Sequence, residues 1–94
     1  MAIRLERAGV EECIGKVNVA IEELKSAAKQ IDESMNAIAE YWEGEAYNKA
    51  RATYEEEYQN LLKNTVPDAV DNFRAYIEQC KDKIIEIDMM LSGN

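Results

Sequence analysis

The strongest constraint on the fold is an apolar seam over the first half of the chain. Its members alternate steps of four and three residues without a break. This repeat puts them on one stripe of an α-helix and predicts left-handed, coiled-coil-like packing against another helix. We therefore expect a helix over about 6–41. The seam consists of Val10, Ile14, Val17, Ile21, Leu24, Ala28, Ile31, Met35, Ile38 and Trp42.

A second row of mostly small residues runs beside the seam, one every seven residues. It comprises Cys13, Ala20, Ala27, Ser34 and Tyr41. The distance between two packed helices depends on the side chains at the contact, so small residues permit a close approach. We therefore expect Ala20 and Ala27 to mark a face that another helix can approach.

A glycine follows soon after the only tryptophan of the chain, at the end of this pattern. Gly44 can adopt the left-handed conformation that caps a helix and lets the chain reverse. We therefore predict a turn over 42–45. Trp42 either closes the core there or projects as a recognition anchor.

The second half of the chain predicts another helix over about 46–91, antiparallel to the first. Its apolar residues are Tyr47, Ala50, Tyr54, Tyr58, Leu61, Leu62, Val66, Val70, Phe73, Ile77, Cys80, Ile84, Ile87 and Leu91. They include the steps of four and three that define a seam, most regularly through Phe73, Ile77 and Ile84. Between Tyr54 and Val70 every step is four residues, which is a stutter that locally unwinds a supercoil.

Pro67 lies inside the stutter, and an interior proline removes one backbone hydrogen bond. Two structures fit this position. The helix is either continuous and kinked near 63–67, or it breaks and Thr65 caps a new helix. The apolar stripe continues across the proline, which favours the kink.

Length and charge restrict the classes of protein. Ninety-four residues make one domain, 1–94, and a two-helix hairpin of this size leaves an apolar face open. We therefore expect an all-α antiparallel hairpin that dimerises into a four-helix bundle. The formal net charge is −8 with no basic cluster, which argues against nucleic acid and anionic membranes as partners. No apolar run is long enough to span a bilayer, so we expect no membrane span.

The usual equipment of an enzyme is absent from the sequence. There is no histidine, no glycine-rich phosphate loop and no nucleophile elbow, so we expect no enzyme, no cofactor and no metal site. The carboxylates of Asp32-Glu33 and Glu55-Glu56-Glu57 fall largely off the apolar stripes. We interpret them as solvated helix faces.

Two further groups of residues have more than one interpretation. Cys13 and Cys80 are too few for a disulfide scaffold, and we interpret them as buried thiols of a reducing compartment. Tyrosines near the predicted turn are interpreted as rim packing with hydroxyls that reach water, or alternatively as an aromatic recognition patch. They are Tyr41, Tyr47, Tyr54 and Tyr58.

The stretch from Ile38 to Tyr47 has Trp42 and Gly44 at the centre of a heptad-patterned chain. It resembles the Trp-x-Gly family of type VII secretion substrates, the family of the early secreted antigenic target proteins. The resemblance implies a hairpin that pairs as a homodimer, or as a heterodimer with a related helical protein. It also implies export from a Gram-positive bacterium through a machinery driven by a hexameric ATPase, with Trp42 and Gly44 forming half of a composite export signal.

The resemblance implies a protein that is secreted after a cytoplasmic stage. The first residues lack the apolar stretch of a secretory signal, in agreement with a route that does not read one. The family's second signal is usually Tyr-x-x-x-Asp/Glu after the second helix, yet no tyrosine of the predicted second helix has an acid at that spacing. The nearest substitute is Ile84-x-x-x-Asp88, followed by Leu91.

Three functions are therefore carried forward. The first is a secreted substrate or effector of a type VII system, acting by protein recognition as a helical dimer. The second is a co-secreted targeting partner for a larger toxin, which the missing Tyr-x-x-x-acid pattern favours slightly. The third is a cytoplasmic helical adaptor unrelated to secretion.

Overall fold

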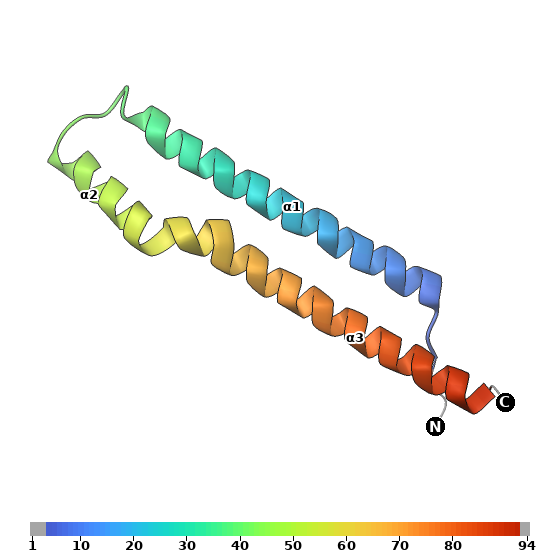
Figure 1. Cartoon of the computed structure of the whole chain (residues 1–94). Helices are drawn as coiled ribbons and strands as arrows, with labels where there is room; N and C mark the ends of the chain where they lie inside the picture. Colours follow the sequence, from blue (N-terminus) through green and yellow to red (C-terminus); the bar gives the residue numbers. More distant parts are fainter. Residues whose placement is uncertain (1–3, 93–94) are drawn as a thin grey trace.

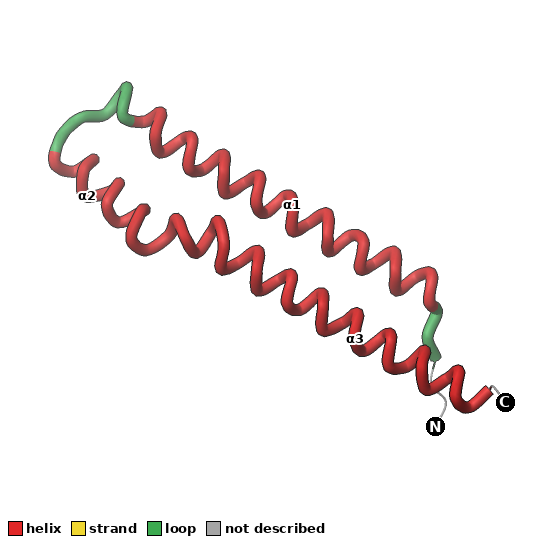
Figure 2. Tube along the Cα trace, in the orientation of Figure 1, coloured by secondary structure: helices red, strands yellow, loops and turns green. Residues whose placement is uncertain are grey.

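The computed structural model describes residues 4–92, which form a long antiparallel helical hairpin measuring 73 × 19 × 18 Å (Figure 1). Helix α1 (Arg7–Ile38) runs along one side, and a loop at the tip leads into the returning helix. That helix comprises α2 (Glu45–Thr53), the π-helical turns η1 (Tyr54–Tyr58) and η2 (Leu61–Thr65), and α3 (Val66–Ser92) (Figure 2). The described residues contain helices and no strand, which confirms the all-helical class.

Helix α1 ends earlier than the seam predicts, at Ile38 and not at residue 41. Its last backbone bonds tighten: the N–H of Glu40 donates to the carbonyl of Ala37 at 3.1 Å, and the N–H of Tyr41 donates to that of Ile38 at 2.9 Å. Such three-residue bonds satisfy the last carbonyls of a helix while ending its regular winding. Trp42 consequently lies in the loop and not on the helical seam.

The returning helix passes through Pro67 without a break. Its backbone is helical from Glu45 to Ser92, and Thr65 lies inside η2 and does not begin a new helix. Proline has no N–H to donate to Lys63, four residues earlier. The turn before it is π-helical, with the N–H of Val66 donating to the carbonyl of Leu61 five residues back.

The π-helical turns also account for the stutter in the sequence. A bond from residue i+5 to residue i uses one residue more per turn than an α-helix does. Steps of four between Tyr54 and Val70 therefore remain near one line along this part of the helix. The path of the helix is visibly irregular between α2 and α3 (Figure 1).

The core between the helices is thin. From α1 it contains Ile14, Ile21 and Ala28, spaced seven residues apart, and from the returning helix Tyr47, Tyr54 and Pro67. The other seam residues of α1 lie half-buried beside them, except for Ile31, which is exposed: Val10, Val17, Leu24, Met35 and Ile38. The seam is therefore only partly covered by the second helix.

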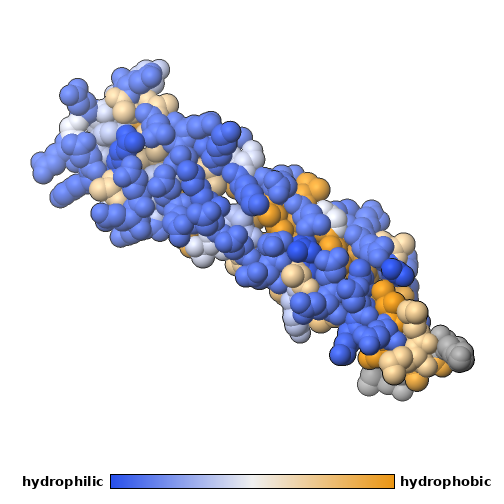
Figure 3. Space-filling view, viewed as in Figure 1, coloured by the Kyte–Doolittle hydropathy of each residue, from blue (hydrophilic) through white to orange (hydrophobic). Residues whose placement is uncertain are grey.

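An apolar surface remains open along the half of the hairpin that contains the chain ends (Figure 3). Phe73 on α3 is 61 % exposed, whereas Ile77 and Ile84 are half-buried. A groove of about 490 Å³ runs between α1 and α3 here, lined mainly by Gly9, Val10, Cys13, Ile14, Val17, Phe73 and Ile77. Ala20 and Ala27, the predicted close-approach face, are exposed. None of the helices between residues 4 and 92 combines the length and apolar character needed to cross a bilayer.

Candidate recognition site at the hairpin tip

Trp42 lies in the loop that joins the two sides of the hairpin. Its N–H donates to the carbonyl of Ile38 at 2.9 Å, which ties its backbone to the end of α1. Trp42 is 45 % exposed, and its indole meets the ring of Tyr47 at 5.5 Å between centroids, with the planes tilted by 59°. The side chain is thus packed on one side and open to solvent on the other. This arrangement lies between the two predicted alternatives, a residue that closes the core and a projecting recognition anchor.

Gly44 holds the one left-handed backbone conformation of the described chain, with φ 135° and ψ 179°. This region is accessible to glycine and almost no other residue. The prediction that Gly44 caps the first helix is wrong in its position, because α1 has already ended at Ile38. Gly44 is instead the N-cap of α2, and its carbonyl accepts the first helical bond from the N–H of Asn48 at 3.1 Å.

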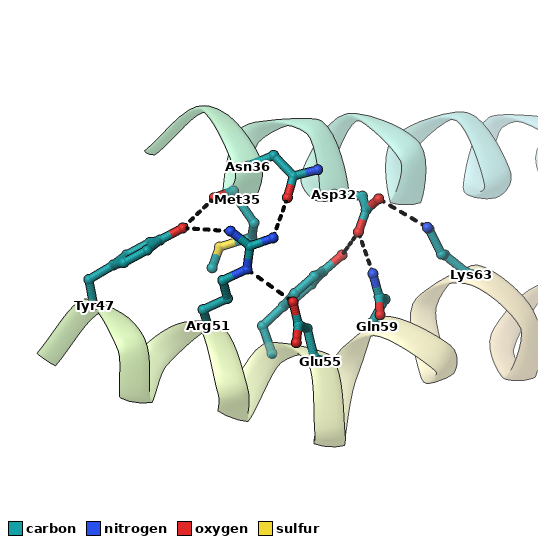
Figure 4. Close-up of polar contacts among 9 residues, drawn as sticks. Asp32, Met35, Asn36, Tyr47, Arg51, Glu55, Gln59 and Lys63 are labelled. Carbon is teal, nitrogen blue, oxygen red and sulfur yellow. Dashed lines mark hydrogen bonds and ion pairs between the residues drawn. The ribbon is translucent and has the colours of Figure 1, made fainter. Parts of the chain in front are cut away.

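Tyr47 is buried, its ring contacts Trp42, and it connects α2 to the end of α1 (Figure 4). Its hydroxyl donates to the backbone carbonyl of Met35 at 3.2 Å. In a helix that continued, that carbonyl would accept from the N–H of Ala39. The tyrosine therefore satisfies one of the orphan carbonyls at the end of α1.

Arg51 spreads its guanidinium across three partners (Figure 4). Nη1 donates to the hydroxyl of Tyr47 at 3.2 Å, Nη2 to Oδ1 of Asn36 at 3.0 Å, and Nε to Oε1 of Glu55 at 3.0 Å. The bond to Glu55, and next the bond to Tyr47, raise the pKa of Arg51. The fixed fork of an arginine joins both helices at this level.

Asp32 is the centre of a second cluster, further from the tip. Its carboxylate accepts from the hydroxyl of Tyr54 at 3.2 Å, from Nε2 of Gln59 at 2.6 Å and from Nζ of Lys63 at 3.0 Å. The first π-helical turn places Gln59 directly above Tyr54, since the N–H of Gln59 donates to the carbonyl of Tyr54. All three donors can consequently reach one carboxylate on α1.

The expectation that Asp32 lies on a solvated face is therefore wrong. Its side chain is only 22 % exposed. The hydrogen bond from Gln59, followed by that from Lys63, lowers the pKa of the carboxyl group. Burial, together with the bond to Asp32, raises the pKa of Tyr54.

The four tyrosines of the predicted patch divide into two pairs. Tyr47 and Tyr54 are buried with their hydroxyls bonded to α1, so the interpretation that these hydroxyls reach water is wrong for them. Tyr41 and Tyr58 are exposed. With Trp42, Tyr41 forms the aromatic surface of the tip.

No protein-family model matches this chain, and no curated protein and no solved structure is significantly similar to it.

The C-terminal candidates lie at the opposite end of the hairpin. Ile84, Asp88 and Leu91 line a hollow of about 500 Å³ together with Leu5 and Arg7. Ile84 is half-buried, whereas Leu91 is 80 % exposed. The structure brings these three residues together, far along the hairpin from Trp42.

Cys13 and Cys80 are both exposed free thiols, so the interpretation of buried thiols is wrong for the hairpin.

Lys81 is a charged residue that is buried. Its side chain is only 8 % exposed, and its Nζ lies 3.5 Å from Oε1 of Glu11 on α1. The sequence does carry a signal for Lys81, which follows Ile77 by four residues on the apolar stripe. Within the described residues, no three histidine, cysteine, aspartate or glutamate side chains gather in a group that could hold a metal ion.

Proposed function

We propose that this protein acts by protein–protein recognition as a small substrate of a Gram-positive type VII secretion system. The observation that carries the proposal is the position of Trp42 and Gly44 at the tip of an antiparallel hairpin, with the indole partly exposed. The tip presents an aromatic side chain on a backbone turn that only glycine supports. Aromatic side chains with one packed and one solvated side are typical of recognition surfaces.

Pairing of two hairpins is the second part of the proposal. The groove between α1 and α3 is apolar and open, and Phe73 stands exposed at its edge. Exposed apolar surface stabilises association when a second molecule covers it. A homodimer, or a heterodimer with a related helical protein, would complete a four-helix bundle.

Light scattering tests the pairing directly. We expect a dimer at micromolar concentration, and Phe73→Asp should shift it toward monomer because the charge would enter the apolar contact. Tyr76→Asp is the matched control, since Tyr76 is equally exposed but does not line the groove. A stable monomer of the wild type would contradict the bundle.

Export tests the function. The full chain is expressed in a Gram-positive host with a working type VII system, with its membrane ATPase intact or disabled. We expect the protein in the culture medium only when the ATPase is active. Retention in the cells under both conditions would overturn the proposal and favour a cytoplasmic adaptor.

The role of Trp42 is tested in the same assay. Trp42→Ala should abolish export but leave helicity unchanged, because the indole is nearly half exposed. Tyr58→Ala is the control, since it removes an aromatic ring of similar exposure that lies on the returning helix and outside the tip loop. A collapse of helicity in Trp42→Ala would make Trp42 a core residue.

A co-secreted targeting partner is the second candidate. The C-terminal residues Ile84, Asp88 and Leu91 lack the tyrosine of the usual family signal, which favours a chain that completes the signal of a larger toxin. In that case the protein would co-purify with the helical N-terminal region of such a toxin. Export without any co-purifying toxin would favour the autonomous substrate.

A further inference from the structure

The orientation of Trp42 depends on contacts that reach back to α1. We propose that Tyr47 and Arg51 form a brace that positions the indole of Trp42 for recognition. The brace rests on the proposed function, because it matters only if Trp42 is read by another protein. Neither residue belongs to the Trp-x-Gly motif of Trp42 and Gly44.

Trp42 lies outside the regular helices that hold most side chains of the hairpin. It lies in a loop, two residues before the conformationally permissive Gly44. Tyr47 provides the one aromatic ring that meets the indole within the described residues, at 5.5 Å and with a 59° tilt. Tilted pairs of this kind prefer a defined edge-to-face geometry. The position of the Tyr47 ring therefore sets the position of the indole.

Tyr47 is held at both ends of its side chain. The residue is 6 % exposed, so its ring is enclosed by neighbours. Its hydroxyl donates to the carbonyl of Met35 and accepts from Nη1 of Arg51, both at 3.2 Å. A phenol has a single proton to donate, so the bond to Met35 uses its donor and the bond from Arg51 occupies an acceptor site.

Arg51 transmits this restraint to α1 by a second route. Its Nη2 donates to Asn36 at 3.0 Å, one residue along the chain from Met35. Its Nε is bonded to Glu55, which keeps the plane of the guanidinium fixed. The Tyr47 hydroxyl thus lies between the end of α1 and a clamped guanidinium.

Tyr54 provides a matched comparison within the same helix. It is also buried, and its hydroxyl also donates across the hairpin, to Asp32 at 3.2 Å. It makes no ring contact with Trp42. Removing either hydroxyl deletes one bond between the helices, but only the loss at Tyr47 should change the freedom of Trp42.

The experiment uses the fluorescence of Trp42, which is the only tryptophan of the full chain. Tyr47→Phe and Arg51→Lys are compared with wild type and with Tyr54→Phe, by acrylamide quenching and anisotropy under selective tryptophan excitation. Lysine keeps the charge of Arg51 but cannot form the fork. We expect both brace variants to raise quenching and lower anisotropy with helicity unchanged, and Tyr54→Phe to match wild type. The rise is limited to about twofold, because the indole is already 45 % exposed.

Export of the same variants separates the two proposals. We expect Tyr47→Phe and Arg51→Lys to reduce export, and Tyr54→Phe to leave it unchanged. Wild-type quenching in both brace variants overturns the brace, even if Trp42→Ala still blocks export. Increased quenching together with normal export of both Tyr47→Phe and Trp42→Ala supports the brace and overturns the recognition role of Trp42.

Discussion

The two halves of this hairpin are held together by different forces. Near the tip, side chains of the returning helix make directed hydrogen bonds to α1, at Asp32, Met35 and Asn36. Toward the chain ends, α1 and α3 meet through aliphatic side chains and a cross-helix ion pair between Lys81 and Glu11. In the tip half these polar side chains find their hydrogen-bond partners within the hairpin, whereas the terminal half leaves an apolar groove uncovered.

This difference bears on how the chain is used. Hydrogen bonds fix distance and direction, so they specify the register of two helices without a large core. Apolar contact is non-directional, so an open apolar face adapts to a partner helix. A thin hairpin can therefore hold one end in a fixed shape while the other end stays open to a partner, as the proposed function requires.

The largest effect is expected from Ile21→Ala, which tests whether the halves unfold together. Ile21 is 5 % exposed in the middle of α1, and such a truncation costs about 2–5 kcal/mol in the free energy of unfolding. Urea denaturation followed by circular dichroism and by Trp42 fluorescence should show the same lowered midpoint with both probes. Val19→Ala, at a position that is 58 % exposed, should change stability by less than about 0.5 kcal/mol. An unchanged fluorescence midpoint in Ile21→Ala would make the tip an independent folding unit.

A smaller loss, centred on the tip, is expected from Gly44→Ala. The backbone at φ 135° and ψ 179° is strained for any side chain, at about 1–3 kcal/mol. Gly15→Ala is the control of opposite sign: its new methyl group would meet nothing within 4 Å, and it should stabilise α1 by about 0.5–1 kcal/mol. Thermal denaturation of both variants measures the difference. Equal stability of Gly44→Ala and wild type would mean that the loop adopts another conformation in solution.

The acid dependence of stability should report on the Asp32 cluster. The folded pKa of Asp32 lies below its unfolded value, because Gln59 and Lys63 bond to the ionised carboxylate. The stability that ionised Asp32 contributes is therefore complete above the pKa of Asp32 in the unfolded chain. It is lost as the pH falls through the pKa of Asp32 in the folded protein. Asp32→Asn should flatten this part of the acid limb in denaturation measured across pH. Glu33→Gln, at the exposed neighbouring carboxylate, should keep the wild-type slope; a steep limb in Asp32→Asn would place the titration elsewhere.

The smallest energetic effect is expected for thiol reactivity, which tests directly whether the groove of the terminal half is covered. Cys13 lines the open groove, so a thiol reagent should reach it in the isolated hairpin. Its reaction should slow as rising protein concentration drives pairing and covers the groove. Ser26→Cys in a chain with Cys13→Ser and Cys80→Ser places the thiol on the polar side of α1, where the rate should stay constant. A Cys13 rate independent of concentration would show that the groove stays open.

Periodicity in the sequence identified the helical class and the residues at the tip. The four-three pattern assigns faces to each helix, and the break at Gly44 marks the reversal. The stutter between Tyr54 and Val70 carried the signal of the π-helical turns, although the form of the unwinding was not evident from spacing alone. The end of α1 was placed too late because Trp42 continues the seam in sequence but not in space.

The cross-helix bonds were beyond the reach of periodicity. Asp32 belongs to the polar side by spacing, yet its partners come from residues that a regular α-helix would direct elsewhere. Tyr47 and Tyr54 read as ordinary rim tyrosines until the acceptors on α1 are known. A pattern along one helix shows which side of that helix faces inward. It does not show which residue of the other helix lies opposite a given side chain.

The π-helical turn η1 has a consequence for how this chain can change length. Its three exposed glutamates, Glu55, Glu56 and Glu57, lie in a turn that already contains one residue more than an α-helix needs. Losing Glu56 would turn it into an ordinary turn with Gln59 still directly above Tyr54. The same loss inside α3 would rotate every later side chain by about 100°. Related chains that differ by one residue should therefore gain or lose it here.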